Sequence, residues 1–377
     1  MLSRPLVSRR QFVRGLVAAG AAGPTVLTSL SRARDAASER LTLGMIGVGT
    51  MGRGHLGRFL GYGDVQIVAV CDVVDERRDH AKARVEEHYA KQAGKSSYKG
   101  CATYNDFREL LAIERLDAVL IATPDHWHTI PAVLAARAKK DIYCEKPLTL
   151  TIGEGRRLVN EVRANNVIFQ TGSQQRSEFD GKFRSACEWI RNGRIGKLKT
   201  VRIGVGAPPL PCDLPEQPVP AGTDWNFWLG PAPWRGYNEA LCPKGVHQHF
   251  PAFRNYREYA GGGLADMGAH HFDIAQWAMD MDGSGPVKIE PPAGDATTGL
   301  RFTYASGVEM FHGGPSGCTF EGETGTIYVD RDKLESTPET IAKTPLSESE
   351  KPLYRADDHG RNWLDCIRDR KLPIADV

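Results

Sequence analysis

A short apolar strand followed at once by three spaced glycines constrains this chain more than any other feature. Residues 47–52 read GVGTMG and follow the apolar run 41–46. A helical pattern comes next, and a second apolar strand at 65–70 leads to Asp72, which lies 20 residues beyond Gly52. The first glycine of such a motif permits a tight turn, the second lets a diphosphate approach the backbone, and the third allows close helix–strand packing. The spacing therefore predicts a dinucleotide-binding βαβ unit.

Two contacts to the dinucleotide follow from this unit. The diphosphate would lie at the N-terminus of the helix, where free backbone N–H groups and the helix dipole attract an anion. Asp72 would accept hydrogen bonds from the adenosine ribose and repel a 2′-phosphate, so NAD is favoured over NADP. Arg77 and Arg78 lie nearby and would weaken that preference. A glycine turn in an ordinary α/β domain is the alternative interpretation.

Strand and helix patterns continue to alternate after the glycine motif. Near-continuous apolar strands of this kind are typical of a doubly wound parallel sheet with helices on both faces. We expect strands at 117–122, 141–144 and 167–171, separated by helices at 131–140 and 151–165. Ligands of such sheets bind beyond the carboxyl ends of the strands. The polar segments at those ends are 123–128 (TPDHWH), 145–147 (EKP) and 172–176 (GSQQR).

The second half of the chain has a different pattern. A β-rich run at 197–205, short strands with glycine turns between 287 and 330, and a hairpin pattern at 318–329 indicate antiparallel pairing. The stretch 208–233 is too rich in proline for a strand interior and is expected to form an ordered excursion over the active site. We therefore expect an α/β Rossmann domain at 41–172 and an α+β domain at 173–377.

Length and charge balance favour a globular protein over one that binds nucleic acid or a membrane through its net charge. With 377 residues, of which 41% are apolar and 25% charged, the chain has the mix of a globular protein of about two domains. The 48 basic and 46 acidic residues nearly cancel, so no net field attracts nucleic acid or an anionic membrane. Beyond the N-terminus no apolar run approaches the length of a membrane span, which predicts no stable membrane insertion.

The first 40 residues are typical of an export signal. Residues 8–13 read SRRQFV and precede an uncharged run at 15–30 that is rich in Ala, Gly, Val and Leu. Paired arginines ahead of a bulky apolar residue resemble the twin-arginine signal, so residues 1–40 are expected to be a signal peptide and linker. The protein would then be periplasmic or located in the cell envelope. An amphipathic arm of the mature protein is the alternative.

Cysteine and histidine patterns predict no metal site. The eight cysteines form no C-x-x-C pair. The histidine pairs at 126/128, 247/249 and 270/271 have no metal-binding motif around them. A disulfide between Cys212 and Cys242, in an oxidising compartment, is the alternative to free thiols.

Four motifs in this order resemble the Gfo/Idh/MocA family of NAD(P)-dependent sugar and polyol oxidoreductases. They are the glycine motif, ATP at 122–124 with His128 beyond it, EKP at 145–147 and GGLADMGAH at 262–270. The pieces DHWH at 125–128, WNFWLGPAP at 225–233 and GAHH at 268–271 are similar to an exported bacterial branch. The resemblance implies a second domain whose open, mainly antiparallel sheet covers the nicotinamide, and a homo-oligomer formed through the open sheet face. Members of that branch usually run several dozen residues further, which implies a truncated C-terminus and a weakly anchored helix at 359–370.

The resemblance also assigns chemical roles. Lys146 matches a family lysine that hydrogen-bonds the reacting hydroxyl, and the peptide bond before Pro147 is often cis in the family. Asp266 and His270 are four residues apart on the expected opening turn of a helix that runs to Met279, so their side chains would share a face. His270 would accept a proton near pH 7. Asp266 would orient His270 or hold a substrate hydroxyl.

The expected contacts extend over both domains. The cofactor contacts are Gly47, Gly49, Thr50, Met51, Gly52, Asp72, Thr123, Pro124, Asp125, His128, Glu145 and Lys146. The candidate substrate contacts are Arg176, Tyr237 and Tyr259.

Three functions are consistent with these features. The first is an oxidoreductase that removes hydride from a CH–OH group of a sugar or polyol. Since an exported protein meets essentially no free NAD, its cofactor is expected to be tightly held and recycled in place. The second is a redox-neutral glycoside hydrolase or lyase that acts through a transient keto-sugar. The third is a non-catalytic carbohydrate-binding protein that contains NAD.

Overall fold

The computed structural model describes residues 40–377, so the predicted export signal lies, apart from Arg40, outside the described residues. The first domain contains a six-stranded parallel sheet in the order β3-β2-β1-β4-β5-β6. Its strands are β1 (Leu41–Ile46), β2 (Val65–Cys71), β3 (Ala102–Tyr104), β4 (Ala118–Ile121), β5 (Asp141–Cys144) and β6 (Phe169–Thr171). Its helices are α3 (Thr50–Leu60), α4 (Asp75–Gln92), α5 (Phe107–Leu111), α6 (Thr129–Arg137) and α7 (Ile152–Asn165). The predicted doubly wound sheet is confirmed.

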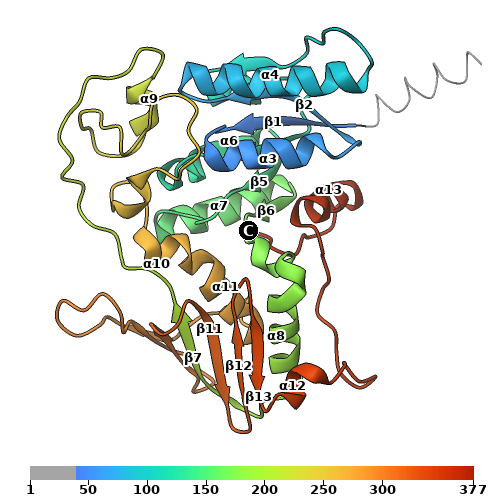
Figure 1. Ribbon diagram of the computed structural model, residues 1–377, viewed down its shortest axis with the longest axis vertical. Coiled ribbons are helices and arrows are strands. Elements are labelled where there is room, and N and C mark those ends of the chain that lie inside the picture. The colour runs from blue at the N-terminus through green and yellow to red at the C-terminus, as the bar shows by residue number, and fades with distance from the viewer. Residues whose placement is uncertain (1–39) are drawn as a thin grey trace, which may run out of the picture.

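Helices cover both faces of this sheet because its strands are apolar on both sides. In β1, Leu43 and Met45 contact the core formed with α3 and α4, whereas Ile46 contacts the core formed with α5, α6 and α7. Strand β1 pairs with both β2 and β4, and the chain order reverses there (Figure 1). The glycine segment after β1 therefore lies at the topological switch point, where ligands bind in such sheets.

The second domain contains a seven-stranded sheet in the order β13-β12-β11-β7-β10-β9-β8. Its strands are β7 (Leu198–Gly204), β8 (Lys288–Glu290), β9 (Arg301–Thr303), β10 (Glu309–His312), β11 (Gly317–Gly322), β12 (Thr326–Val329) and β13 (Leu334–Thr337). The β7–β10 pair is parallel and the other pairs are antiparallel. Helices α8 (Lys182–Arg191) and α11 (Gly268–Ala278) pack on one face. The mainly antiparallel second sheet is thus confirmed.

A long excursion between β7 and α10 (Gly262–Asp266) lies beside the carboxyl end of the first sheet, at the left of Figure 1. It contains α9 (Trp225–Leu229) and the 3-10 turn η4 (Ala252–Asn255). Trp225 and Trp228 stack with ring centroids 4.7 Å apart in a small core of its own. The excursion is therefore ordered, and it extends well beyond the predicted 208–233.

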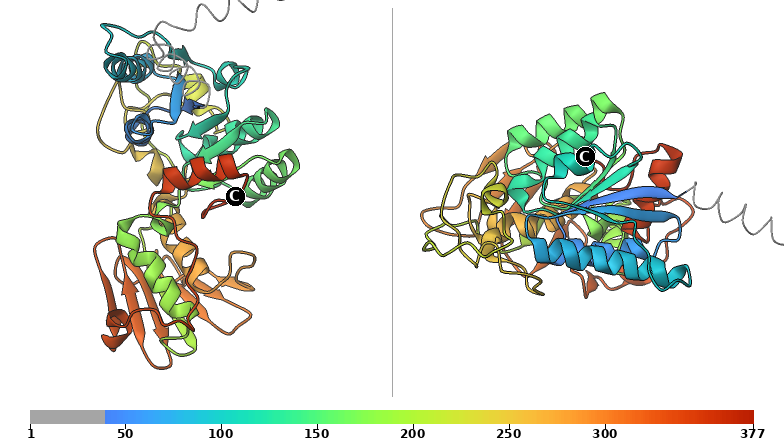
Figure 2. Two further views of the ribbon diagram at one scale, coloured as in Figure 1. Left: turned by 90° about the vertical axis from the view of Figure 1, so that its right-hand side faces the viewer. Right: turned by 90° about the horizontal axis from the view of Figure 1, so that it is seen from above.

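Helix α13 (His359–Asp369) departs from the expected domain boundary. The expected boundary assigns all of 173–377 to the second domain, and the resemblance implies a weakly anchored helix at 359–370. Trp363 is instead fully buried in the core of the first domain, 5.8 Å from the ring of Phe59, and Figure 2 shows α13 against that domain. Thr171 N–H also donates to the carbonyl of Ala375. The apolar face of α13 finds its partner among residues about 300 positions earlier, which local sequence patterns do not reveal.

The remaining helix, α12 (Thr340–Lys343), is a single turn after β13. Within residues 40–377 we find no helix with the length and apolarity needed to span a bilayer.

Candidate active site

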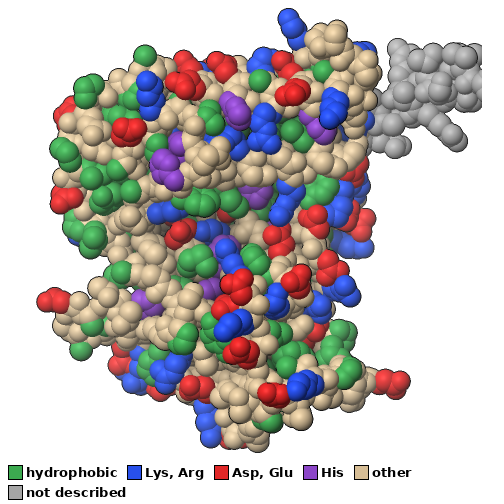
Figure 3. Space-filling view, viewed as in Figure 1, with side chains coloured by type: hydrophobic (Ala, Val, Ile, Leu, Met, Phe, Trp, Pro, Cys, Tyr) green, Lys and Arg blue, Asp and Glu red, His purple; other side chains and the backbone are tan. Residues whose placement is uncertain are grey.

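A cavity of about 620 Å³ lies between the carboxyl ends of the first sheet, the excursion and the start of α11. Its lining includes the glycine segment and Asp72, here called the cofactor end, and Lys146, Asp266 and His270, here called the substrate end. Lys, Arg and His side chains are visible across the waist between the two lobes (Figure 3). The predicted cofactor site and the predicted catalytic residues thus share one cavity.

Eleven of the predicted cofactor contacts line this cavity. They are Gly47, Gly49, Thr50, Met51, Asp72, Thr123, Pro124, Asp125, His128, Glu145 and Lys146. Gly52 does not line the cavity, which agrees with its expected role in packing helix against strand.

The glycine segment has the geometry that a bound diphosphate requires. Gly47 has φ +84°, and a Cβ there would come within 2.7 Å of the Ala122 backbone. A Cβ on Gly52 would come within 2.1 Å of the Gly47 carbonyl oxygen. A Cβ on Gly49, in contrast, would meet no described atom within 4 Å. The first and third glycines are therefore required by protein contacts, whereas the second leaves free space at the start of α3, where a diphosphate fits.

Asp72 lies directly after β2, as the spacing predicts. Its Oδ2 accepts a hydrogen bond from Val48 N–H at 2.9 Å, and its Oδ1 accepts one from Val74 N–H at 3.0 Å. These bonds hold the carboxylate at the cavity wall, and each oxygen keeps a further lone pair for a ligand hydroxyl.

Glu145 and Lys146 follow β5, and the Lys146–Pro147 peptide bond is cis, as the resemblance implies. Glu145 is buried, and its Oε1 lies 2.7 Å from His55 Nε2 and accepts a hydrogen bond from Gln174 at the same distance. Burial alone would raise the pKa of Glu145, but the hydrogen bond to His55 and the charges around it hold that pKa at about 2. Glu145 is therefore ionised at neutral pH, and its carboxylate is held in place by His55 and Gln174.

Lys146 is the partner of Asp266. Its Nζ donates to Asp266 Oδ1 and, at 2.9 Å, to the Asp266 carbonyl. Arg254 Nε lies 3.8 Å from the other carboxylate oxygen of Asp266. The expected single helix is interrupted at Met267, so Asp266 ends α10 while His270 belongs to α11. The carboxylate thus orients the lysine, a pairing 120 residues apart that helical spacing does not predict.

His270 lines the cavity but is only 3% exposed. Burial, together with the positive charges of Lys146 and Arg331, lowers the pKa of His270 to about 3. His270 is therefore a neutral imidazole at pH 7, the form that can accept a proton, but it is a weaker base than an exposed histidine. Within the described residues its Nδ1 is buried without a hydrogen-bond partner.

Two residues of the segment after β4 also line the cavity, His128 and Asp125. His128 contacts the carbonyls of Thr123 at 2.9 Å and Pro147 at 2.8 Å, so it holds the loops after β4 and β5 together. Asp125 is buried, and this burial raises its pKa to about 6. Asp125 is thus a cavity carboxyl that takes up a proton close to neutral pH.

The three candidate substrate contacts are corrected by the structure. The buried Arg176 forms ion pairs with the partly exposed carboxylates of Asp273 and Asp282. The Tyr237 hydroxyl donates to the Cys242 carbonyl at 2.8 Å, and the Tyr259 ring is fully buried in the core of the excursion. None of the three lines the cavity that the described residues form. The partners of Arg176 lie about 100 residues away, so its sequence position alone suggested the wrong role.

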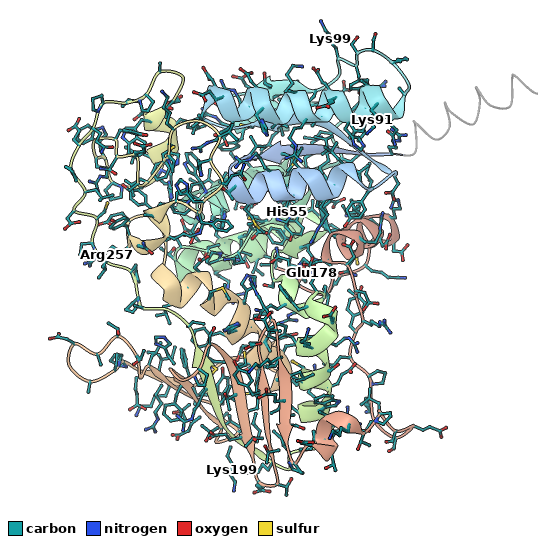
Figure 4. All side chains as sticks on the ribbon, in the orientation of Figure 1. His55, Lys91, Lys99, Glu178, Lys199 and Arg257 are labelled. Atoms are coloured by element: carbon teal, nitrogen blue, oxygen red, sulfur yellow. The ribbon has the colours of Figure 1, made fainter. Side chains whose placement is uncertain are left out.

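Sequence reasoning also missed residues that do line the cavity. His55 and Glu178, labelled in Figure 4, come from α3 and from the segment before α8. Arg254 and Arg331 also line the cavity. His55 lies three residues after Gly52, so a signal for it was present, whereas isolated arginines in loops carry no comparable motif.

Residues 243–251 of the excursion, here called the strap, contact the glycine helix. Thr50 Oγ1 donates to the carbonyl of His249 at 2.9 Å, and Arg53 donates to that of His247. Arg77 Nε donates to the carbonyl of Gly245 at 3.0 Å. The strap therefore closes one side of the predicted cofactor site.

Within residues 40–377 no group of three His, Cys, Asp or Glu side chains has a geometry suited to a metal ion. The eight cysteines all lie in this part of the chain and are free thiols, so Cys212 and Cys242 are not bridged.

The fold and the cavity define a two-domain protein with a Rossmann dinucleotide site that faces an α+β domain. Residues 41–173 match the family model described as "Oxidoreductase family, NAD-binding Rossmann fold", and residues 211–371 match "Oxidoreductase family, C-terminal alpha/beta domain". Both belong to the Gfo/Idh/MocA group. The chain belongs to the Gfo/Idh/MocA oxidoreductase family.

Relatives and solved structures agree with this assignment. The chain is 31% identical to the myo-inositol 2-dehydrogenase of Thermotoga maritima over 261 residues, which are 68% of this chain and 61% of that protein. It is similar in fold to the aldose-aldose oxidoreductase of Caulobacter crescentus, with a TM-score of 0.58, 17% identity, and 89% and 92% of the two chains covered. The WlbA dehydrogenase of Bordetella pertussis, solved with NADH and UDP-GlcNAcA, has a TM-score of 0.56 at 18% identity, with 89% and 91% covered. The chain spans about three-fifths of the length of the Thermotoga relative.

Proposed function

We propose that the protein is an NAD-dependent oxidoreductase that acts on a CH–OH group of a sugar or polyol. The observation that carries this proposal is the shared cavity, which is lined both by Gly49, with the open space beside it, and by the Lys146–Asp266–His270 group. The name of the Thermotoga relative supports a polyol as one class of substrate.

The side chains divide the chemistry among them. NAD, when bound, supplies the acceptor for the hydride that leaves the substrate carbon. Lys146, oriented by Asp266, would donate to the reacting oxygen and stabilise its developing charge. That oxygen becomes strongly acidic as the hydride leaves, so the neutral imidazole of His270 can accept its proton although the pKa of His270 is only about 3.

Two measurements test this function. Denaturation of the purified protein should release a nicotinamide dinucleotide, identified by mass spectrometry. Incubation of the native protein with a panel of sugars and polyols should produce the absorbance of reduced nicotinamide. A nucleotide that no sugar or polyol reduces would favour the non-catalytic carbohydrate-binding protein, and absence of both signals would reject the proposal.

Preference for NAD over NADP is part of the proposal. The Asp72 carboxylate lies at the cavity wall, where it would repel a 2′-phosphate. Arg77 donates to the carbonyls of Pro243 and Gly245, and Arg78 pairs with Asp75. The two arginines that would accommodate a 2′-phosphate are therefore engaged with protein groups.

A redox-neutral glycoside hydrolase or lyase is the second candidate, and Asp125 favours it. Elimination next to a transient keto group needs a further acid or base, and burial raises the pKa of this cavity carboxyl to about 6. Release of an aglycone from a glycoside, with no lasting change in nicotinamide absorbance, would identify this reaction.

Tight retention of the cofactor and export by the twin-arginine route belong together in the proposal. The twin-arginine pattern supports export, and a cofactor inserted before export would have to stay bound outside the cytoplasm. The strap supports retention, because its hydrogen bonds to Thr50, Arg53 and Arg77 would have to open for a dinucleotide to leave. The proposal also includes a homo-oligomer. The face of the second sheet opposite α8 and α11 would form the contact surface between its subunits.

The strap gives a direct test of retention. Gly245 has φ +59°, and a Cβ there would lie 2.5 Å from Glu76 Oε2, so Gly245→Ala should loosen the strap. If the substitution strains the closed strap by about 1.4 kcal/mol, the nucleotide should dissociate about tenfold faster. The measurement is the rate at which nucleotide leaves the protein in the presence of an enzyme that consumes it.

The matched control is Gly94→Ala, because Gly94 has φ +62° but lies at the end of α4, away from the strap. Equal release rates for the two variants would contradict a retaining role of the strap.

A further inference from the structure

The substrate end of the cavity contains a cation without a carboxylate partner. Arg331, in the loop after β12, lines the cavity and is half-buried, and its guanidinium lies 4.8 Å from the centre of the Phe179 ring. Within residues 40–377 no carboxylate oxygen lies within 4 Å of its nitrogens. Burial lowers the pKa of Arg331, opposed by the more distant charges of Asp266 and Glu178.

A second guanidinium, that of Arg254 in η4, lines the same end. It lies between two aromatic rings, 4.8 Å from the centre of Phe250 and 4.7 Å from that of Phe253, which holds its plane in place. Its nearest carboxylate is Asp266 at 3.8 Å, which already accepts the hydrogen bond from Lys146. Its buried Nη1 has no hydrogen-bond partner among the described residues.

The other carboxylates of the cavity are committed elsewhere. Glu178 pairs with Arg58, and Glu145 is bound by His55 and Gln174. Asp125 offsets part of the charge of Arg254. One carboxylate, Asp266, therefore lies within 4 Å of two cations, whereas Arg331 has no carboxylate within that distance among the described residues.

We propose that the substrate is a sugar acid, whose carboxylate is bound by Arg331 with support from Arg254 while Lys146 and His270 contact the hydroxyl that is oxidised. This inference rests on the proposed function and specifies its substrate class. The planar guanidinium matches a carboxylate with two parallel hydrogen bonds, and such charge-assisted bonds strengthen in a partly desolvated site.

The test compares each acid with its neutral counterpart on the nucleotide-loaded enzyme. Glucuronate, galacturonate and mannuronate are measured by calorimetric binding against glucose, galactose and mannose, with the hexose 6-phosphates as a third arm. At least one uronate should bind about 100-fold more tightly than its hexose, and the difference should shrink at high salt. If the uronates do not bind, or a hexose or a hexose phosphate binds more tightly, the inference is overturned.

Variants separate substrate binding from a structural role. Arg331→Gln should weaken uronate binding about 30-fold and leave hexose binding within about threefold, because the neutral sugar makes no use of the charge. Arg331→Lys should recover part of the loss. The control is Arg257→Gln, since Arg257 is an exposed arginine of the excursion and does not line the cavity (Figure 4). Equal losses for uronate and hexose in Arg331→Gln would reject the inference.

The outcome is independent of whether oxidation occurs. Preferred binding of a uronate without reduction of nicotinamide would support the anion site and reject the proposed oxidation. Oxidation of neutral sugars with no preference for acids would keep the proposed function and reject the anion site.

Discussion

Lys146→Met is expected to lower turnover at least about 10³-fold while the nucleotide stays bound. The substitution keeps the length of the side chain but removes the ammonium group that Asp266 orients at the cavity wall. Loss of a donor that stabilises charge on the reacting oxygen typically costs 10²- to 10³-fold, and loss of its part in proton transfer adds to this. The measurements are the rate of nicotinamide reduction and the nucleotide content of the purified variant.

The control for this variant is Lys91→Met, which removes an exposed lysine at the end of α4, far from the cavity (Figure 4). Lys91→Met should retain the rate of the parent. If Lys146→Met retains a rate within tenfold of the parent, Lys146 has no role in the chemical step. Loss of the nucleotide together with the rate would instead assign Lys146 to cofactor binding.

Gly49→Val is expected to abolish cofactor binding without unfolding the protein. A Cβ at this position meets no described atom within 4 Å, so the added methyl groups enter the space expected for the diphosphate. We expect affinity for NAD to fall at least about 100-fold, because the backbone can no longer approach the anion. Calorimetric titration with NAD measures the affinity, and thermal unfolding of the nucleotide-free protein measures the stability.

Two other glycines separate the cofactor effect from a folding effect. Gly63→Val adds the same side chain at a site that also meets no described atom within 4 Å but lies outside the cavity, so NAD affinity should stay unchanged. Gly52→Ala should destabilise the fold instead, since its Cβ would clash with the Gly47 carbonyl at 2.1 Å. If Gly49→Val binds NAD as tightly as Gly63→Val, the diphosphate does not lie at this loop.

The first domain was predictable because its signals are local. The alternation of strands and helices, the glycine spacing and the acid after β2 each depend on residues that are close in sequence. Every strand and helix expected between 41 and 171 is present, with bounds shifted by a few residues at most. The second sheet was predictable as mainly antiparallel, because the β-rich run at 197–205 and the glycine turns between 287 and 330 are local signals too.

The candidate site was predictable only in part. Lys146 and His270 line the same cavity, as the motifs indicate, but the pairing of Lys146 with Asp266 joins residues 120 positions apart. Arg176 was misassigned because Asp273 and Asp282, which bind it, lie about 100 residues away. Arg331 was missed for the same reason, since nothing in its local sequence distinguishes it from a surface arginine.

The sequence by itself determined the dinucleotide-binding loop, the parallel first sheet and the positions of the principal polar side chains at its carboxyl edge, because backbone geometry and strand periodicity depend on neighbouring residues. Tertiary structure decided which charges meet, how deeply His270 is buried, and that α13 completes the first domain. Those properties depend on desolvation and on contacts between distant segments, and both arise only when the two domains and the excursion close around one cavity.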